Sequence, residues 1–519
     1  MKTFPYGTGY LTISTVLDIA SGRVKGVIEN EARERIERSN REVLAIAAED
    51  KVVYGITTGF GILANTRISE EDTRLLQYKI LQSHSVGVGD PIPEEIAKLM
   101  LITKVHALAQ GFSGVQLSTL ERICWHIEHD VIPIVPEKGS VGASGDLAPL
   151  AHLFLPLVGL GECTYQGRRY PSGMLLREFD MEPVSLGPKE GLALINGTQF
   201  ILSYAIKAVQ MLHNCLESAD IIGAMSLESL TGTKAPFDER LHELRPYRGN
   251  KLVAQRLRKL LADSQIMESH IDCGRVQDPY SLRCMPQVHG ASRNTWLHLK
   301  ELVSIELNSV TDNPIIFSAD DTVSGGNFHG QPLALPLDYA CFASSEVGNI
   351  SDRRCYLLLE GKWGLPMLLM NNVGLNSGFM IPQYTTAALV TENKTLCFPA
   401  SADSIPTSLG QEDHVSMGSI SGRKAYQVLE NLQYILAIEL MSASQAIEFR
   451  RPLKSSALLE FAHSYVRSFV GFAEEDRIFS EDIIKIRNII SDFSFVREMN
   501  DFSVSKNINL NGGYDEFTL

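Results

Sequence analysis

The sequence predicts a mainly α-helical protein, a bundle of long helices preceded by a mixed, loop-rich amino-terminal region. Three observations predict this fold class. Glycine and proline gather in one segment, Pro133 to Pro149, which is expected to be irregular. Neither an internal repeat nor a low-complexity tract is present. Apolar residues recur at three- and four-residue spacing, as a buried helix face requires, over residues 200–227, 296–310, 338–359 and 424–448.

The elements expected before residue 191 are shorter. Residues 10–14 have the pattern of a strand, and residues 52–65 form a loop broken by glycines. Helical patterns cover residues 29–48, 70–83, 92–109 and 116–130. In the later part of the chain, prolines 286, 314, 332, 366 and 406 are expected in loops between helices. We therefore divide the chain into a mixed, loop-rich amino-terminal region, residues 1–195, and a central and carboxyl-terminal long-helix bundle, residues 196–519.

Composition excludes several classes of protein. A chain of 519 residues with 44% hydrophobic and 21% charged residues can bury a large core, which argues against disorder. Its net charge of −14 repels phosphate backbones and anionic lipids, so no nucleic acid and no membrane is expected as a partner. The amino terminus has no apolar export signal, and the eight cysteines form no CxxC pair. Scattered thiols fit a reducing compartment, so a cytoplasmic location is expected.

A metal site receives little support from the sequence. His126 and His129 are spaced so that both imidazoles lie on one face of a predicted helix. No third ligand accompanies them, and a zinc site needs at least three protein ligands. We therefore expect a solvated helix face there and no metal.

The most informative segment is GSVGASGD, from Gly139 to Asp146. It lacks the Gly-Lys-Ser/Thr of a P-loop and the Gly-x-Ser-x-Gly of a nucleophile elbow. Gly145 has no side chain, so its amide nitrogen can approach the carbonyl carbon of Ala143 across a tight turn. Closing that ring with loss of water, and losing a second water from Ser144, leaves a methylidene conjugated to an imidazolone. No standard side chain supplies such an electrophile.

The stretch GSVGASGDLAPLAH closely resembles the aromatic amino acid ammonia-lyase family, whose prosthetic group is this 4-methylidene-imidazol-5-one (MIO). The resemblance implies an MIO formed autocatalytically from Ala143, Ser144 and Gly145, with no external cofactor. It also implies a mainly α homotetramer with active sites shared between subunits. Five further segments resemble family motifs in the family's order: residues 54–61, 193–199, 277–284, 326–330 and 411–417.

These matches assign roles that isolated residues would not suggest. An isolated tyrosine, asparagine or phenylalanine is usually a packing or turn residue. By resemblance, Tyr54 is the base near the β-carbon, Asn196 holds the MIO carbonyl oxygen, and Phe328 packs against the prosthetic group and the substrate ring. On another segment, which also carries the substrate-binding candidate Gln277, Tyr280 is placed near the amine. Arg283 there clamps the substrate α-carboxylate through its planar guanidinium.

Two residues bear on the identity of the substrate. His84 lies in a segment that lines the pocket for the aromatic ring in the family, although tyrosine-specific members also carry a histidine nearby. Glu412 belongs to a Gln-Glu-Asp-His sequence that resembles the histidine-specific members, where phenylalanine and tyrosine enzymes usually carry Asn-Gln-Asp. A carboxylate can accept an imidazole N–H, whereas against a phenyl ring it would be desolvated and unpaired.

The expected reaction is therefore the non-oxidative deamination of L-histidine to trans-urocanate and ammonia. A tyrosine or phenylalanine ammonia-lyase and an MIO-dependent aminomutase stay open as alternatives within the family. A non-catalytic helical scaffold is the alternative from a different class. Cys273 is expected to be a thiol at the edge of the pocket without a catalytic role, and residues 366–373 depart from the more acidic version found in many histidine enzymes.

Overall fold

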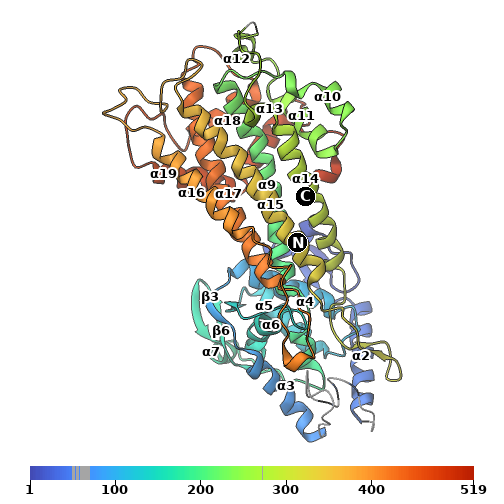
Figure 1. Cartoon of the computed structure of the whole chain (residues 1–519). Coiled ribbons are helices and arrows are strands. Elements are labelled where there is room, and N and C mark those ends of the chain that lie inside the picture. The colour runs from blue at the N-terminus through green and yellow to red at the C-terminus, as the bar shows by residue number, and fades with distance from the viewer. Residues whose placement is uncertain (49–52, 54–55, 57, 59–69, 272) are drawn as a thin grey trace. The chain divides into compact units, whose positions relative to one another are not determined.

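The structure is a computed structural model that describes residues 1–48, 53, 56, 58, 70–271 and 273–519 (Figure 1). It is mainly α-helical, which confirms the predicted fold class. In the described part of the chain, no helix combines the length and hydropathy needed to span a bilayer. The chain forms two compact units: unit 1 is Met1–Lys207, Lys300–Leu337 and Pro399–Arg423, and unit 2 is Ala208–Leu299, Asp338–Phe398 and Lys424–Leu519. The boundary expected after residue 195 stays a prediction.

Four long helices confirm the helices predicted from the four periodic stretches. Each of them contributes residues to both units. Three of the four begin six or more residues earlier than expected. Pro286 and Pro332 were expected in loops, and this expectation is wrong, because both lie in the first turn of a helix. Proline is tolerated there, since a first-turn N–H has no intrahelical acceptor. The four helices are α9 (Gln199–Ser229), α14 (Met285–Leu307), α15 (Gln331–Leu359) and α17 (Gly418–Glu448).

Unit 1 combines shorter helices with small sheets. Strand β1 pairs with β2 in parallel, β6 lies between β4 and β7 in an antiparallel sheet, and β3 pairs with β5. The expected helices before residue 191 are present within a few residues of their predicted ends. The elements are β1 (Lys2–Pro5), α1 (Ile13–Ala20), β2 (Val24–Val27), α2 (Asn30–Ala48), α3 (Glu70–His84), β3 (Val88–Pro91), α4 (Glu94–Leu108), α5 (Leu117–Glu128), β4 (Ile132–Pro133), β5 (Pro136–Lys138), α6 (Leu147–Phe154), η2 (Leu155–Val158), β6 (Glu162–Tyr165), β7 (Arg168–Pro171), α7 (Ser172–Glu178), α8 (Glu190–Ile195), β8 (Ile315–Ile316), β9 (Thr322–Val323) and η4 (Ser408–Gly410).

The prediction of a strand over residues 10–14 is wrong. The chain instead begins helix α1 at Ile13, and the Thr12 hydroxyl accepts a hydrogen bond from the Thr15 N–H at 3.1 Å. A threonine that caps a helix in this way satisfies an N–H without an intrahelical partner. The buried face of the helix is formed by Ile13, Val16 and Leu17, which are three and four residues apart. In the sequence, the short alternation of apolar and polar residues at 10–14 concealed this helical spacing.

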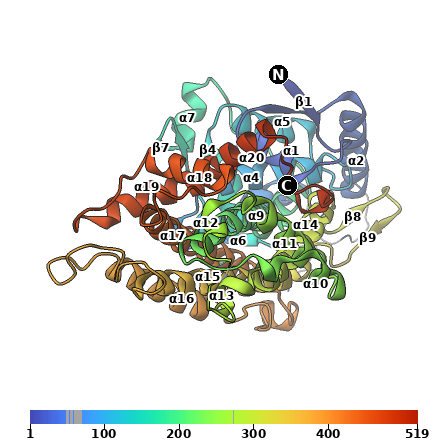
Figure 2. The same cartoon turned by 90° about the horizontal axis from the view of Figure 1, so that it is seen from above.

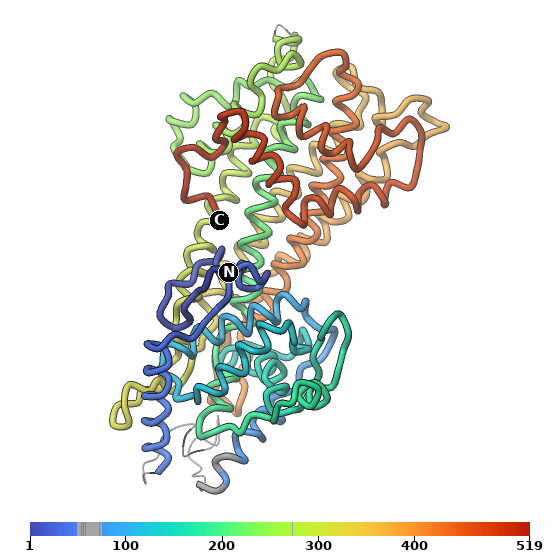
Figure 3. The backbone as a smooth tube through the Cα atoms, turned by 180° about the vertical axis from the view of Figure 1, so that it is seen from behind, coloured from blue at the N-terminus to red at the C-terminus, as the bar shows by residue number. Residues whose placement is uncertain are grey.

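Unit 2 is built around the remaining parts of the four long helices. Helix α20 packs against both α18 and α19 (Figure 2). The carboxyl-terminal segment, red in Figure 3, returns to α9, where the Phe517 carbonyl hydrogen-bonds to Nε2 of His213 at 3.0 Å. The other elements are η3 (Ala235–Phe237), α10 (Glu239–Leu244), α11 (Arg248–Leu260), α12 (Gln265–Glu268), α13 (Tyr280–Arg283), α16 (Met380–Leu396), α18 (Ala457–Arg467), α19 (Phe479–Ser491), α20 (Ser494–Ser505) and η5 (Asp515–Phe517).

A buried cluster of charged side chains joins α9, α11 and α14 inside unit 2. Arg293 lies 2.8 Å from Glu217 and 2.6 Å from Asp220, and Arg256 lies 2.8 Å from each of the same two carboxylates. Burial alone would raise the pKa of Glu217, but the two arginine charges lower it from 4.5 to about 2. The stabilisation from this group is therefore present above about pH 4.5 and is lost as the pH falls through 2.

We expect Arg293→Met to lower the free energy of unfolding by about 3–5 kcal/mol, because it leaves two buried carboxylates with one arginine partner fewer. Urea denaturation followed by circular dichroism measures the change. Arg240→Met is the matched control, since Arg240 forms its ion pair with Asp238 at the exposed surface. Equal effects of the two substitutions would contradict the assigned role of the buried cluster.

Candidate active site

The glycine-rich segment lies in unit 1 between β5 and α6 and makes a tight, left-handed turn. The backbone φ angle is +81° at Gly142, +49° at Ser144 and +78° at Gly145. A positive φ is rare for a residue with a side chain and costs about 1–3 kcal/mol, so the surrounding structure must hold Ser144 in place. The three residues 143–145 are called the triplet below.

The triplet pairs with the link between α8 and α9, which consists of residues 196–198. The Gly197 N–H donates to the Ser144 carbonyl at 3.3 Å, and the Asp146 N–H donates to the Gly197 carbonyl at 2.8 Å. Together these bonds make Gly145 and Gly197 a parallel bridge pair. A Cβ atom on Gly145 would overlap the Gly197 carbonyl oxygen, so this approach requires glycine at 145.

Asp146 fastens the same region to the start of α9. Its Oδ2 accepts the backbone N–H groups of Phe200 and Ile201, each at 3.0 Å, which are otherwise without partners at a helix start. Burial raises the pKa of Asp146 to about 7, although the hydrogen bonds from Ile201, Phe200 and Ser140 oppose the shift. No site role is predicted for Asp146 from the sequence, although this residue directly follows the triplet.

Asn196 is buried at the carboxyl end of α8. Its Nδ2 donates to the Asn313 carbonyl at 2.9 Å and lies 3.4 Å from Oδ1 of Asp312. Asp312 in turn forms a buried ion pair with Lys189 at 2.5 Å. Oδ1 of Asn196 has no hydrogen-bond partner among the described residues, which is costly for a buried acceptor.

Glu412 contacts the triplet directly, although it lies 268 residues from Ser144 in the sequence. The Ser144 hydroxyl donates to Oε1 of Glu412 at 3.3 Å. Oε2 accepts from the hydroxyl groups of Thr407 and Ser408 at 3.0 and 2.9 Å. The half-buried carboxylate is therefore held by three hydroxyl groups, one of which belongs to the triplet.

His84 ends α3 and borders a cavity of about 200 Å³ that Ala143 also lines. Its Nδ1 lies 3.0 Å from the hydroxyl of Ser83. Burial lowers the pKa of His84, while a backbone hydrogen bond to Ile80 and the charge of Glu412 oppose the shift. The His84 imidazole thus forms part of the wall of the cavity beside the triplet, and the charge of the Glu412 carboxylate acts on this imidazole.

Ser416 brings three of the motif segments together. A Cβ on Gly142 would overlap the Ser416 hydroxyl, and one on Gly330 would lie 2.9 Å from it. The His329 and His414 rings stack beside this point with their centroids 5.8 Å apart. The half-buried Phe328 lies on the same 326–330 loop of unit 1.

The predicted residues of the 277–284 segment lie in unit 2. Tyr280 and Arg283 form the ends of α13, and the Arg283 guanidinium lies over the Tyr280 ring at 4.5 Å from its centroid. Nε of Arg283 is buried without a hydrogen-bond partner among the described residues. Gln277 and Cys273 both line a cavity of about 770 Å³ in this unit. Tyr54 lies outside the described residues.

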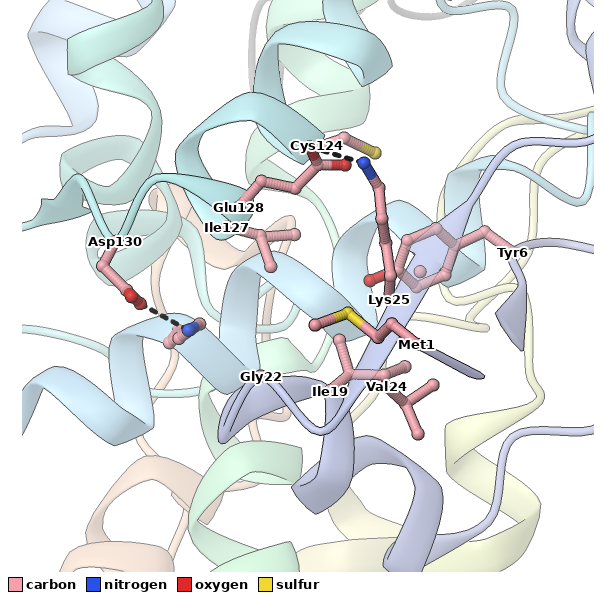
Figure 4. Close-up of a pocket in the computed structure, with 12 residues that line it drawn as sticks. Met1, Tyr6, Ile19, Gly22, Val24, Lys25, Cys124, Ile127, Glu128 and Asp130 are labelled. Atoms are coloured by element: carbon pink, nitrogen blue, oxygen red, sulfur yellow. Dashed lines mark hydrogen bonds and ion pairs between the residues drawn. The ribbon is translucent and has the colours of Figure 1, made fainter. Parts of the chain in front are cut away.

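Other candidate sites contain none of the predicted residues. The solvated helix face expected at His126 and His129 is wrong for His126, which is buried, whereas His129 is exposed. Nδ1 of His126 hydrogen-bonds to the Val131 carbonyl and Nδ1 of His129 to the Trp125 carbonyl, each at 2.9 Å. The described residues contain no group of three potential metal ligands. Residues of β2 and α5 line a separate hollow of about 240 Å³. Tyr6 and Lys25 are among the residues that border it (Figure 4).

Comparison with known proteins places this arrangement in a family. Residues 11–468 match the family model described as aromatic amino acid lyase. The chain belongs to the aromatic amino acid lyase family. It is 48% identical to a histidine ammonia-lyase of Sorangium cellulosum, over 92% of this chain and 96% of that protein. The match identifies the chain as an enzyme of the lyase class.

Two solved structures of the family have the same fold. A histidine ammonia-lyase from Trypanosoma cruzi superposes with a TM-score of 0.90 at 39% identity, covering 100% of this chain and 98% of that one. A tyrosine aminomutase from Streptomyces globisporus superposes with a TM-score of 0.90 at 32% identity, covering 98% and 99%. The fold is therefore shared by family members whose names state different activities.

We expect Gly145→Ala to destabilise unit 1 more than the matched substitution Gly167→Ala. Both glycines have positive φ angles, +78° and +72°, but a Cβ on Gly167 meets nothing within 4 Å. The left-handed conformation alone costs about 1–2 kcal/mol, and overlap with the Gly197 carbonyl adds roughly 1–3 kcal/mol at residue 145. Denaturant titration of both variants measures the difference, and equal losses would show that the close approach to Gly197 is unimportant.

Proposed function

We propose that this lyase removes ammonia from L-histidine without oxidation and releases trans-urocanate. The observation that carries the proposal is the hydrogen bond between the Ser144 hydroxyl and the Glu412 carboxylate. It joins the residue from which an electrophile would be made to the residue expected to recognise an imidazole. The 48% identity to a histidine ammonia-lyase over most of both chains supports the same substrate.

The prosthetic group of the proposal is an MIO made from Ala143, Ser144 and Gly145, with no external cofactor. The residues present fit this group. The left-handed turn at Ser144 and Gly145 shortens the path between the Gly145 nitrogen and the Ala143 carbonyl carbon, and Gly197 leaves space for glycine alone. Asn196 supplies a buried side chain at the link that pairs with the triplet. When formed, the MIO supplies an electron-poor methylidene that helps a poor leaving amine to depart.

The chain's own residues bind and orient the substrate in this proposal. Glu412 accepts an imidazole N–H, and His84 lines the space for the ring. Dehydration of Ser144 removes its hydroxyl, so the hydrogen bond to Oε1 of Glu412 disappears and that oxygen becomes available to the substrate. A phenyl ring has no N–H to offer, so it would leave a desolvated carboxylate unpaired.

Other residues hold the amino acid part of the substrate and move its proton. Arg283 clamps the α-carboxylate with its planar guanidinium, Tyr280 binds near the amine, and Gln277 contributes to substrate binding. Tyr54 removes the β-proton, for which the phenol pKa must lie below its ordinary value near 10. Phe328 packs against the ring, and Asn196 would hold the MIO carbonyl oxygen through its side-chain amide.

The proposal extends to the assembly and the compartment. The enzyme is a homotetramer in which subunits complete one another's active sites, and it acts in the cytoplasm. Tyr280 supports shared sites, because its side chain is 71% exposed in the single chain despite its proposed role at the substrate. The eight cysteines are all free, which fits a reducing compartment.

Purified protein is expected to convert histidine to urocanate, with much slower turnover of tyrosine and phenylalanine. Urocanate absorbance follows the reaction, and chromatography detects any β-amino acid that an aminomutase would release. Ser144→Ala is the control, since it cannot lose the second water and should be inactive. Intact mass should show the loss of two waters in the wild type and not in this variant. Preferred turnover of tyrosine or phenylalanine, or full activity of Ser144→Ala, would contradict the proposal.

Glu412→Gln is expected to lower kcat/KM for histidine by about 10–100-fold, because a charge-assisted hydrogen bond to the ring is lost. Intact mass should still show the loss of two waters, which separates recognition from formation of the prosthetic group. Glu162→Gln changes an exposed carboxylate of the same unit and should leave kcat/KM unchanged. Wild-type kcat/KM in Glu412→Gln would remove Glu412 from substrate recognition.

A further inference from the structure

Lys104 is a buried cation on a helix that is otherwise packed as core. Every residue of α4 from Ile96 to Leu108 is buried, and the Lys104 side chain is 1% exposed. Burial lowers the pKa of Lys104 to about 7; the charges of Asp312 and Asp146 oppose this shift, and that of Lys189 adds to it. A lysine in such a place destabilises the fold unless its ammonium group is well paired.

The partner of Lys104 is the backbone of the link that holds the triplet. Nζ donates to the Asn196 carbonyl at 2.5 Å and lies 3.5 Å from Oε1 of Gln199. Asn196 ends α8, where a carbonyl has no intrahelical donor and a cation is favoured. Lys104 thus fixes the first residue of the 196–198 link.

The other end of the link is fixed by Asp146, through its hydrogen bonds to the N–H groups of Phe200 and Ile201. Between these two anchors Gly197 makes its bonds to Ser144 and Asp146. Neither of those two bonds uses the Gly145 nitrogen. The link therefore holds the carbonyl of the Ser144–Gly145 peptide and the N–H of the next peptide, and it leaves the Gly145 nitrogen itself to the ring closure.

We propose that Lys104 is a positioning residue for formation of the MIO: by holding the Asn196 carbonyl, it fixes the link against which the triplet closes. This inference depends on the proposed function, since it requires that the triplet cyclises. Ring closure joins the Gly145 nitrogen to the Ala143 carbonyl carbon. The Ala143 oxygen leaves as water with the amide hydrogens of Ser144 and Gly145. The second water takes the Ser144 hydroxyl and the hydrogen on its Cα.

The negative charges around Lys104 explain why a cation is retained here. The Lys189–Asp312 ion pair lies on the side-chain side of Asn196, and Asp146 lies at the far end of the link. An uncharged residue at 104 would leave the Asn196 carbonyl without this donor. It would also reduce the positive charge near the carboxylates of Asp312 and Asp146. A shift of the link by a fraction of an ångström would weaken the bond at 3.3 Å to Ser144 first.

The test compares Lys104→Met with the matched control Lys98→Met. Lys98 is on the same helix and nearly as buried, but it pairs with Asp130 and does not contact the link. Folded protein is isolated by size exclusion and checked by circular dichroism and thermal unfolding. The fraction that has lost two waters is then measured by intact mass. We expect about a tenfold or greater drop in that fraction for Lys104→Met, because a hydrogen bond to a charged group is lost, and no drop for Lys98→Met.

Lys104→Gln provides a second variant in case Lys104→Met does not fold. Its side chain keeps a polar group but is shorter by one bond, so it loses both the charge and the 2.5 Å contact. Folded Lys104→Met or Lys104→Gln that loses two waters as completely as the wild type would overturn the inference. A wild type that retains both waters would instead overturn the proposed prosthetic group, so the two failures are distinguishable.

Discussion

The close approach of Gly145 to Gly197 is the constraint around which unit 1 is arranged. Two backbone hydrogen bonds hold the triplet against the link, and they form only because residue 145 has no side chain. The conformation of Ser144 follows from this pairing, since its positive φ angle is held by neighbours on both sides. A loop of glycines would otherwise be mobile, and here it has one defined geometry.

Buried charged side chains maintain the close approach of Gly145 to Gly197. Lys104 and Asp146 hold opposite ends of the link, and the Lys189–Asp312 pair supports the Asn196 side chain. The buried cluster of Glu217, Asp220, Arg256 and Arg293 in unit 2 obeys the same rule, because each charge there has partners that offset its loss of hydration. Such networks contribute little net stability, but removing one member is costly, so they fix one geometry in preference to others.

Periodicity predicted the long helices well, because a buried face repeats every three or four residues over many turns. It failed at residues 10–14, where one capping threonine decides between strand and helix, and at Pro286 and Pro332, which the first turn of a helix accepts. In the site, the order of the motifs indicated Ser144 and Glu412, and these residues are in contact. Lys104 had no such signal, because a lone lysine in an apolar helix has no local pattern that identifies its distant carbonyl partner.

In the proposed function, the Glu412 carboxylate connects recognition of the substrate with formation of the prosthetic group. Its carboxylate has three hydroxyl donors, and two of them, on Thr407 and Ser408, do not change when the triplet reacts. They keep Oε2 oriented while Oε1 loses the Ser144 donor in the proposed dehydration. An acceptor that is half-buried, oriented and newly without a donor favours a ligand with an N–H and disfavours one without. In the proposed function, selectivity for an imidazole follows from the hydrogen bonds that this one carboxylate can accept.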